Sequence, residues 1–202
     1  MPKLGMRPIR RRQLVDAAIA SIHQYGLGET TIARIAEKAG VSPGIIHHYF
    51  ADKDDLLFET MRHLLEILRR HAVARLRSAK TPRARLHAIV EASFTEDQFS
   101  ETVSAAWLGL YGNARQSPRL ARILRLYHAR LRSNLVHALK SLVAPPHVED
   151  LAEGIASMID GLWLRCALRG QTGDARIPRA LTHAYVEAQL LRPATMASGP
   201  SE

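Results

Sequence analysis

The chain has 202 residues, of which 47% are hydrophobic and 23% charged, with a single cysteine, Cys166, and a formal net charge of +9. This composition supports a sizeable core and excludes a disordered chain or a disulfide scaffold, and no apolar run approaches the roughly 20 residues that a membrane span needs. We therefore expect a cytoplasmic protein without a membrane partner, and the basic charge suggests a polyanionic partner.

The first eight residues form a basic arm ahead of a helix predicted from about Ile9 to Tyr25-Gly26. Residues 1–50 contain seven Lys or Arg against three Asp or Glu, so +4 of the net +9 falls on a quarter of the chain. These cations are either a solvated terminus or a clamp on DNA phosphates, which supplies affinity and salt dependence rather than sequence choice. We favour the clamp because a DNA-reading pattern follows. The cations of the arm and helix start are Lys3, Arg7, Arg10, Arg11 and Arg12.

The stretch from Thr30 to Phe50 predicts a helix, a tight turn and a second short helix. Thr30 or Thr31 can cap the first helix, and Gly40 follows where a left-handed terminator is needed. Ser42-Pro43 then begins the second helix, because serine is a preferred N-cap and proline suits the first helical position. The pattern is a helix-turn-helix, whose second helix is built to enter a DNA major groove.

The second helix contains no Lys or Arg, so it can select a site but holds DNA weakly by itself. Side chains near its N-terminus read base edges, and affinity must come from the basic arm, from Lys53 and from backbone N–H groups at helix N-termini. His47 and His48 either contact a base or phosphate, or one of them only packs. Ile46 and Phe50 are expected to face the core of the helix-turn-helix unit.

Asp52 is placed to cap a long helix predicted from residue 53 to 79, roughly 40 Å in length, which suits a connecting rod. Five further helices follow. They are predicted at about 82–93, from a capping box at Thr95 and Gln98 to 114, from 117 to 143, from 148 to 169, and from Asp174 or Ile177 to 191.

The fold class is therefore all-α, with about nine helices. We expect a helix-turn-helix DNA-binding domain at residues 1–52, a ligand-binding and dimerisation domain at 53–192, and a disordered tail at 193–202.

The helix predicted from 148 to 169 is apolar on more than one face, which exceeds what packing inside one small domain requires. Helix-turn-helix proteins bind DNA through two recognition helices, which lie about 34 Å apart on one face of the duplex. We therefore expect a homodimer built on this helix and the last one. The alternative is a central core helix. The apolar residues concerned are Ile155, Ile159, Leu162, Trp163 and Leu164.

The run AGVSPGIIHHYF at residues 39–50, followed by Asp52-Lys53, closely resembles the signature of the TetR family of dimeric, all-helical transcriptional repressors. The resemblance covers residues 9–60 and implies that Tyr49 and Lys53 contact phosphates. His47 departs from the family, which often has Tyr there, so no operator sequence is predicted. The DNA-contact set is Arg10, Arg11, Thr31, Ser42, Pro43, Gly44, Ile45, His47, His48, Tyr49 and Lys53.

Two further segments, MPKLGMRPIRRRQL at the N-terminus and IDGLWLRCAL at 159–168, are similar to the choline-responsive branch of this family, which represses glycine betaine synthesis genes. The resemblance implies a double-stranded DNA operator and choline as effector. Ring faces and a carboxylate suit such a cation. Each ring has core packing as its alternative role, and Asp160 can instead pair with Arg165 or lie at the dimer seam. The candidate effector site is Phe99, Trp107, Tyr111, Tyr127, Asp160 and Trp163.

Two rival functions remain open: a TetR-type repressor that responds to another cationic or hydrophobic compound, and a ligand-blind nucleoid-binding protein. Catalysis is not expected, because the sequence has no Gly-rich phosphate loop and no nucleophile elbow. The ten histidines are scattered without a zinc spacing, so neither metal nor cofactor is expected.

Overall fold

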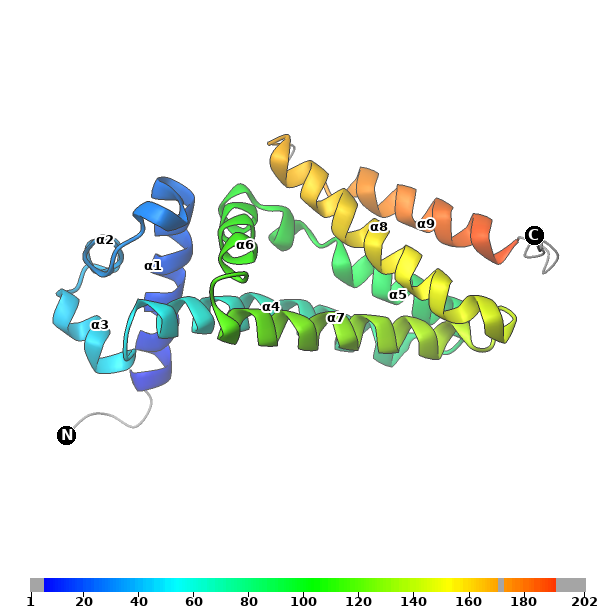
Figure 1. Cartoon of the computed structure of the whole chain (residues 1–202), viewed down its shortest axis with the longest axis horizontal. Coiled ribbons are helices and arrows are strands. Elements are labelled where there is room, and N and C mark those ends of the chain that lie inside the picture. Colours follow the sequence, from blue (N-terminus) through cyan, green and yellow to red (C-terminus); the bar gives the residue numbers. More distant parts are fainter. Residues whose placement is uncertain (1–5, 171–172, 192–202) are drawn as a thin grey trace, which may run out of the picture. The chain divides into compact units, whose positions relative to one another are not determined.

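The computed structural model describes residues 6–170 and 173–191, and within them it contains nine α-helices, two short 3-10 helices and no strand (Figure 1). The all-α prediction is confirmed. Lys3 and the tail predicted at 193–202 lie outside the described residues. In the described part of the chain, no helix is long and apolar enough to cross a membrane.

The first compact unit comprises the described residues up to Ile67 together with Asp97–Arg125. It contains α1 (Met6–Glu29), α2 (Ile32–Lys38), α3 (Pro43–Tyr49), the start of α4 (Lys53–Ser78), α6 (Glu101–Asn113) and the start of α7 (Pro118–Leu139). In this unit, α1 packs against α2 and α2 against α3 (Figure 1). Its buried core includes Leu14, Ile22, Ile35, Ile46, Phe50, Leu57 and Met61.

The most extensive helix–helix packing in this unit joins α6 to α1. Gly109 permits the close approach, because a Cβ atom there would lie 3.0 Å from the Leu27 Cβ and 3.3 Å from the Ile22 Cγ2. Helix α6, which the sequence places in the second predicted domain, is thus packed on α1 of the first. The functional boundary at residue 52 stays a prediction.

The second compact unit comprises Leu68–Glu96 and the described residues from Leu126 onward. It contains the end of α4, α5 (Pro82–Ser93), most of α7, the 3-10 helix η2 (Pro145–His147), α8 (Val148–Leu168) and α9 (Arg176–Leu190). Within it, α9 packs against both α8 and α5 (Figure 1).

A cluster of six ionisable side chains joins α5 to α9 in the second unit. Glu187 lies 2.6 Å from His87 Nε2 and also pairs with Arg83. On the same pair of helices, Glu91 lies 2.8 Å from His183 Nε2 and 3.2 Å from Arg179 Nη1. The rings of His87 and His183 meet edge to face at 4.7 Å between centroids. We refer to these six side chains as the α5–α9 cluster.

Local capping signals predicted most helix boundaries. The Thr31 hydroxyl accepts a hydrogen bond from Arg34 N at 3.2 Å, and Asp52 Oδ1 accepts one from Asp55 N at 2.7 Å. Gly40 has φ +64°, the left-handed conformation expected of a helix terminator. The helix-turn-helix boundaries are therefore set by contacts within a few residues.

The predicted capping box at Thr95 and Gln98 is wrong. Residues Glu96–Phe99 form the 3-10 helix η1, and α6 begins later, at Glu101, where the Ser100 hydroxyl accepts from Val103 N at 3.4 Å. Gln98 is instead buried, and its Oε1 accepts a hydrogen bond from Trp107 Nε1 at 3.0 Å. A buried tryptophan N–H requires an acceptor, and this distant requirement outweighs the local capping pattern.

Other boundaries shift modestly. Helix α1 begins at Met6 rather than at the predicted Ile9. Pro8 fits in its first turn, because backbone N–H groups there have no acceptor within the helix and the missing N–H costs no hydrogen bond. Its predicted end is confirmed, since Gly26 has a non-helical φ of 74°. Helix α7 ends at Leu139, four residues before the predicted Val143.

Candidate DNA-reading face and effector site

Helix α3 exposes the residues predicted to read DNA. Its buried side chain is Ile46, and Phe50 at its C-cap is also buried, which confirms that both anchor the helix to the core. The opposite side of the helix lies open to solvent, with Ile45 39% exposed. The exposed set is Ser42, Pro43, Gly44, Ile45, His47 and His48.

Ser42 is the N-cap residue of α3, but its side chain makes no capping hydrogen bond. Its hydroxyl, exposed at the start of the reading helix, can therefore bond another group. Thr31 is also exposed, although its hydroxyl already caps α2. Tyr49 is half-buried, and its ring meets that of His48 edge to face at 5.2 Å.

Arg11, predicted as a DNA contact, makes three contacts with the protein itself. Its Nη1 donates to the Tyr49 carbonyl oxygen at 2.9 Å, and its Nη2 lies 3.3 Å from Glu59 Oε2. Its guanidinium carbon lies 4.6 Å from the centroid of the Phe50 ring. The side chain thus joins α1 to α4 and to the C-terminal end of α3. At that end of α3 a cation stabilises the last carbonyl groups of the helix.

Glu59 is the anion of this junction, with its side chain 15% exposed. It also lies 2.6 Å from Arg62 Nη2. Burial by itself raises the pKa of Glu59, but hydrogen bonds and charge from Arg62 and Arg11 outweigh it, so the pKa lies below its ordinary value. The carboxylate therefore stays ionised at neutral pH and holds Arg11 in place.

Arg10 differs from its neighbour, because no hydrogen bond or ion pair engages it among the described residues, and it remains half-buried. Because an α-helix has 3.6 residues per turn, Arg10 and Arg11 point about 100° apart around the axis of α1, and their side chains therefore meet different surroundings. Of the two predicted arm contacts, Arg10 is therefore the one without an ion pair among the described residues, and its contact with a phosphate stays a prediction.

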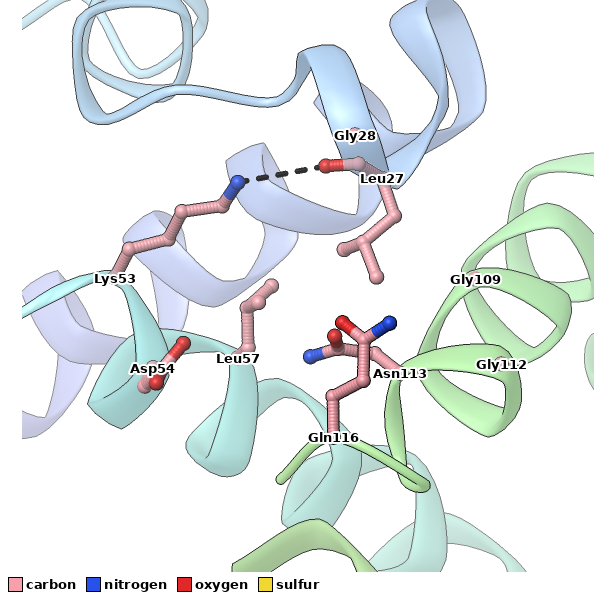
Figure 2. Close-up of a pocket in the computed structure, with 9 residues that line it drawn as sticks. All are labelled: Leu27, Gly28, Lys53, Asp54, Leu57, Gly109, Gly112, Asn113 and Gln116. Carbon is pink, nitrogen blue, oxygen red and sulfur yellow. Dashed lines mark hydrogen bonds between the residues drawn. The ribbon is translucent and has the colours of Figure 1, made fainter.

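Lys53 lines a cavity of about 370 Å³ in the first unit (Figure 2). Its Nζ donates to the Leu27 carbonyl oxygen at 3.4 Å, a long and therefore weak hydrogen bond that DNA phosphate can replace. Figure 2 shows the side-chain amides of Asn113 and Gln116 across the cavity from this amine. No pattern in the sequence points to Asn113 and Gln116, because only the packing of α6 on α1 brings them to this cavity. The other lining residues are Gly28, Asp54, Leu57, Gly109 and Gly112.

The predicted effector residues divide between the two compact units. Phe99 and Trp107 are buried in the first unit, where Trp107 stacks on Tyr111 with 5.3 Å between ring centroids and 26° between ring planes. Tyr127, Asp160 and Trp163 belong to the second unit and are half-buried. That all six line one site stays a prediction.

Asp160 lies beside a histidine of α7. Its Oδ2 is 3.7 Å from His128 Nε2, whereas Arg165 was one of the partners that the sequence left open. Burial raises the pKa of Asp160, with His128 opposing and Glu153 adding to the shift. Burial, followed by the negative charge of Asp160, also raises the pKa of Tyr127. A cation placed near Asp160 would relieve this unfavourable burial.

Large apolar side chains are exposed on the last turns of α8 and the first turns of α9. Leu168 is 70% exposed and Ile177 65% exposed, and Leu164 and Leu181 are also open to solvent. Single exposed leucines are ordinary, but several on two packed helices indicate an interaction surface.

Among the described residues, no group of three or more His, Cys, Asp or Glu could hold a metal ion.

Two family models match the chain. The model for bacterial regulatory proteins of the tetR family matches residues 14–60, and the model for the C-terminal domain of BetI-type transcriptional repressors matches residues 82–191. The chain is also 47% identical over 190 residues to the HTH-type transcriptional regulator BetI of Brucella melitensis, which covers 94% of this chain and 96% of that relative.

Solved structures share the fold. A protein of Pseudomonas aeruginosa PAO1 described as a transcriptional regulator has 26% identity and a TM-score of 0.79, covering 91% of each chain. A protein of Saccharomonospora viridis, also described as a transcriptional regulator and solved in complex with choline, has 20% identity and a TM-score of 0.78. That match covers 89% of this chain and 96% of the other, and at this identity it shows the fold alone.

Proposed function

This chain belongs to the TetR family of bacterial transcriptional regulators, with a BetI-type repressor C-terminal domain, and from this premise we propose that it represses the genes for glycine betaine synthesis from choline, with choline as its effector. The family consists of DNA-binding regulators rather than enzymes. The proposed place of action is the cytoplasm, where the operator DNA is.

The observation that carries the DNA-binding role is the exposed face of α3 above two buried anchors. Ile46 and Phe50 hold the helix, and the six residues from Ser42 to His48 other than Ile46 point away from the core. Because this face has no Lys or Arg, base contacts would come from α3 and phosphate contacts from Arg10, Tyr49 and Lys53.

A homodimer is the second part of the proposal. One reading helix covers only a few base pairs, and paired readers bind half-sites about 34 Å apart. The exposed apolar side chains at the end of α8 and the start of α9 support a symmetric interface there, in which the same surface of each protomer meets its copy.

The effector is the third part. The choline complex of the Saccharomonospora viridis protein and the Trp107–Tyr111 stack support a quaternary ammonium ligand. Helices α4 and α7 each begin in the first compact unit and end in the second. A displacement of either helix on effector binding would therefore also displace its end in the unit that carries α3. Choline must bind more tightly to one spacing of the two DNA-binding units than to another, because a ligand with equal affinity for both leaves the equilibrium between them unchanged.

The deciding experiment measures binding of the full chain to its own upstream DNA by fluorescence anisotropy, with and without choline, and to a scrambled duplex. We expect tight binding to the upstream DNA, weaker binding to the scrambled duplex, and weaker operator binding with choline. A complex that ignores choline but responds to another cationic or hydrophobic compound would remove the effector assignment. Equal binding to both duplexes would instead indicate a ligand-blind nucleoid-binding protein.

A further inference from the structure

Gln98 presents a buried hydrogen-bond donor that the fold does not satisfy. The side chain lies in η1, immediately before α6, and is 2% exposed. Its Oε1 accepts the Trp107 Nε1–H at 3.0 Å. Because the indole nitrogen is only a donor, this contact fixes which end of the amide faces Trp107. The Nε2 group is then buried without a hydrogen-bond partner among the described residues.

An amide N–H₂ group removed from water needs an acceptor, because its lost hydration is otherwise uncompensated. The position of this group beside the Trp107–Tyr111 stack suggests what supplies the acceptor. Ring faces attract a methylated ammonium, which cannot itself accept or donate a hydrogen bond. A donor next to the rings therefore suits an oxygen elsewhere on the same ligand.

We propose that Gln98 is the oxygen-recognising residue of the effector site, with Nε2 donating to the hydroxyl or carboxylate oxygen of a quaternary ammonium whose methylated head lies near Trp107. This inference rests on the proposed effector role. It adds that the oxygen, and not only the cation, is recognised. Gln98 also orients Trp107 through the Nε1–Oε1 hydrogen bond, so one side chain contacts both the ring and the ligand.

The test compares choline with propyltrimethylammonium, in which a methyl group replaces the hydroxyl, by calorimetric titration of the full chain. One hydrogen bond predicts that the wild-type protein binds choline about tenfold more tightly. Gln98→Met keeps a side chain of similar length and volume but has neither the N–H donor nor an oxygen that could accept from the choline hydroxyl. The choline preference should then fall to about onefold, while both cations still bind.

Gln13→Met is the matched control, because it makes the same change at an exposed glutamine of the same unit and should keep the choline preference. Glycine betaine tests the second oxygen type: its carboxylate can only accept a hydrogen bond, so its affinity should fall in Gln98→Met and not in Gln13→Met.

Equal wild-type affinity for choline and propyltrimethylammonium would overturn the role of Gln98, and this comparison needs no variant. An unchanged ratio in Gln98→Met would do the same. If the wild-type protein binds neither cation, the proposed effector is wrong and the assignment of Gln98 falls with it.

Discussion

At the scale of single residues, neighbouring arginines have different roles. Arg11 is held by the Tyr49 carbonyl, Glu59 and the Phe50 ring, whereas Arg10 has no such contact among the described residues. DNA contact by Arg11, which the sequence predicts, is not the role that these contacts favour. Its position instead stabilises the end of the reading helix against α1 and α4.

We expect Arg10→Ala to weaken binding to every DNA sequence and to reduce the slope of log affinity against log salt by about 0.9, the contribution of one phosphate contact. Arg11→Ala should leave this slope unchanged. It should lower the operator preference over scrambled DNA and destabilise the protein by about 1–2 kcal/mol, because a partly exposed charged contact is lost.

Anisotropy titrations at several salt concentrations, together with urea unfolding, measure these effects. Arg11→Lys keeps the charge but loses the planar fork, so we expect only partial rescue of operator preference. An equal fall in salt slope for the two alanine variants would show that Arg11 contacts phosphate after all.

At the scale of elements, we expect the attachment of α9 to depend on pH through the α5–α9 cluster. Burial, then the charges of His183 and Arg83, lower the pKa of His87, while Glu91 opposes the shift. Arg83 also neutralises Glu187, the carboxylate that His87 contacts. Helix α9 therefore packs on α5 around a His87 that favours its neutral form.

A lowered pKa means that folded protein binds fewer protons at His87 than unfolded protein. Its contribution to stability is complete above the unfolded pKa of about 6.5 and declines as the pH falls below that value. We expect the Tm of the wild type to fall more between pH 7.5 and 5.5 than that of His87→Gln, which can still donate to Glu187. The effect should be small, because the side chain is 42% exposed. Thermal unfolding followed by circular dichroism at both pH values tests this, and an equal fall in both proteins would exclude His87 as its source.

At the scale of the whole molecule, α4 and α7 each begin in the first compact unit and end in the second, so continuous helices join the unit that carries α3 to the unit proposed to dimerise. Helix α6, which carries Trp107, packs tightly on α1 through Gly109, so the proposed ring contact adjoins the DNA-reading unit within one compact body. The exposed end of α8 and start of α9 belong to the second unit. DNA binding by two copies of α3 is therefore expected to depend on the exposed surface of α8 and α9, which is remote from α3 in the sequence.

Leu168→Glu or Ile177→Glu should convert the proposed dimer into a monomer, because either change places an unpaired charge in the proposed apolar interface. Operator affinity should fall by more than about tenfold, since one head loses the contribution of the other. Analytical ultracentrifugation and anisotropy measure the two effects.

Leu126→Glu is the matched control: Leu126 is 56% exposed on α7, and this change should preserve both the dimer and operator binding. A monomer produced by Leu126→Glu, or a stable dimer in both α8 and α9 variants, would place the interface elsewhere.

The sequence by itself determined the all-helical class, the helix-turn-helix and the family, because caps, left-handed glycines and apolar periodicity act within one or two turns. Thr31, Gly40 and Asp52 illustrate this. Only the tertiary structure decided that Arg11 contacts Tyr49 and Glu59, that α6 packs on α1, and that Gln98 accepts from Trp107 instead of forming a capping box. Each of these depends on partners distant in the chain, whose burial requires hydrogen bonds and close packing that local patterns cannot express.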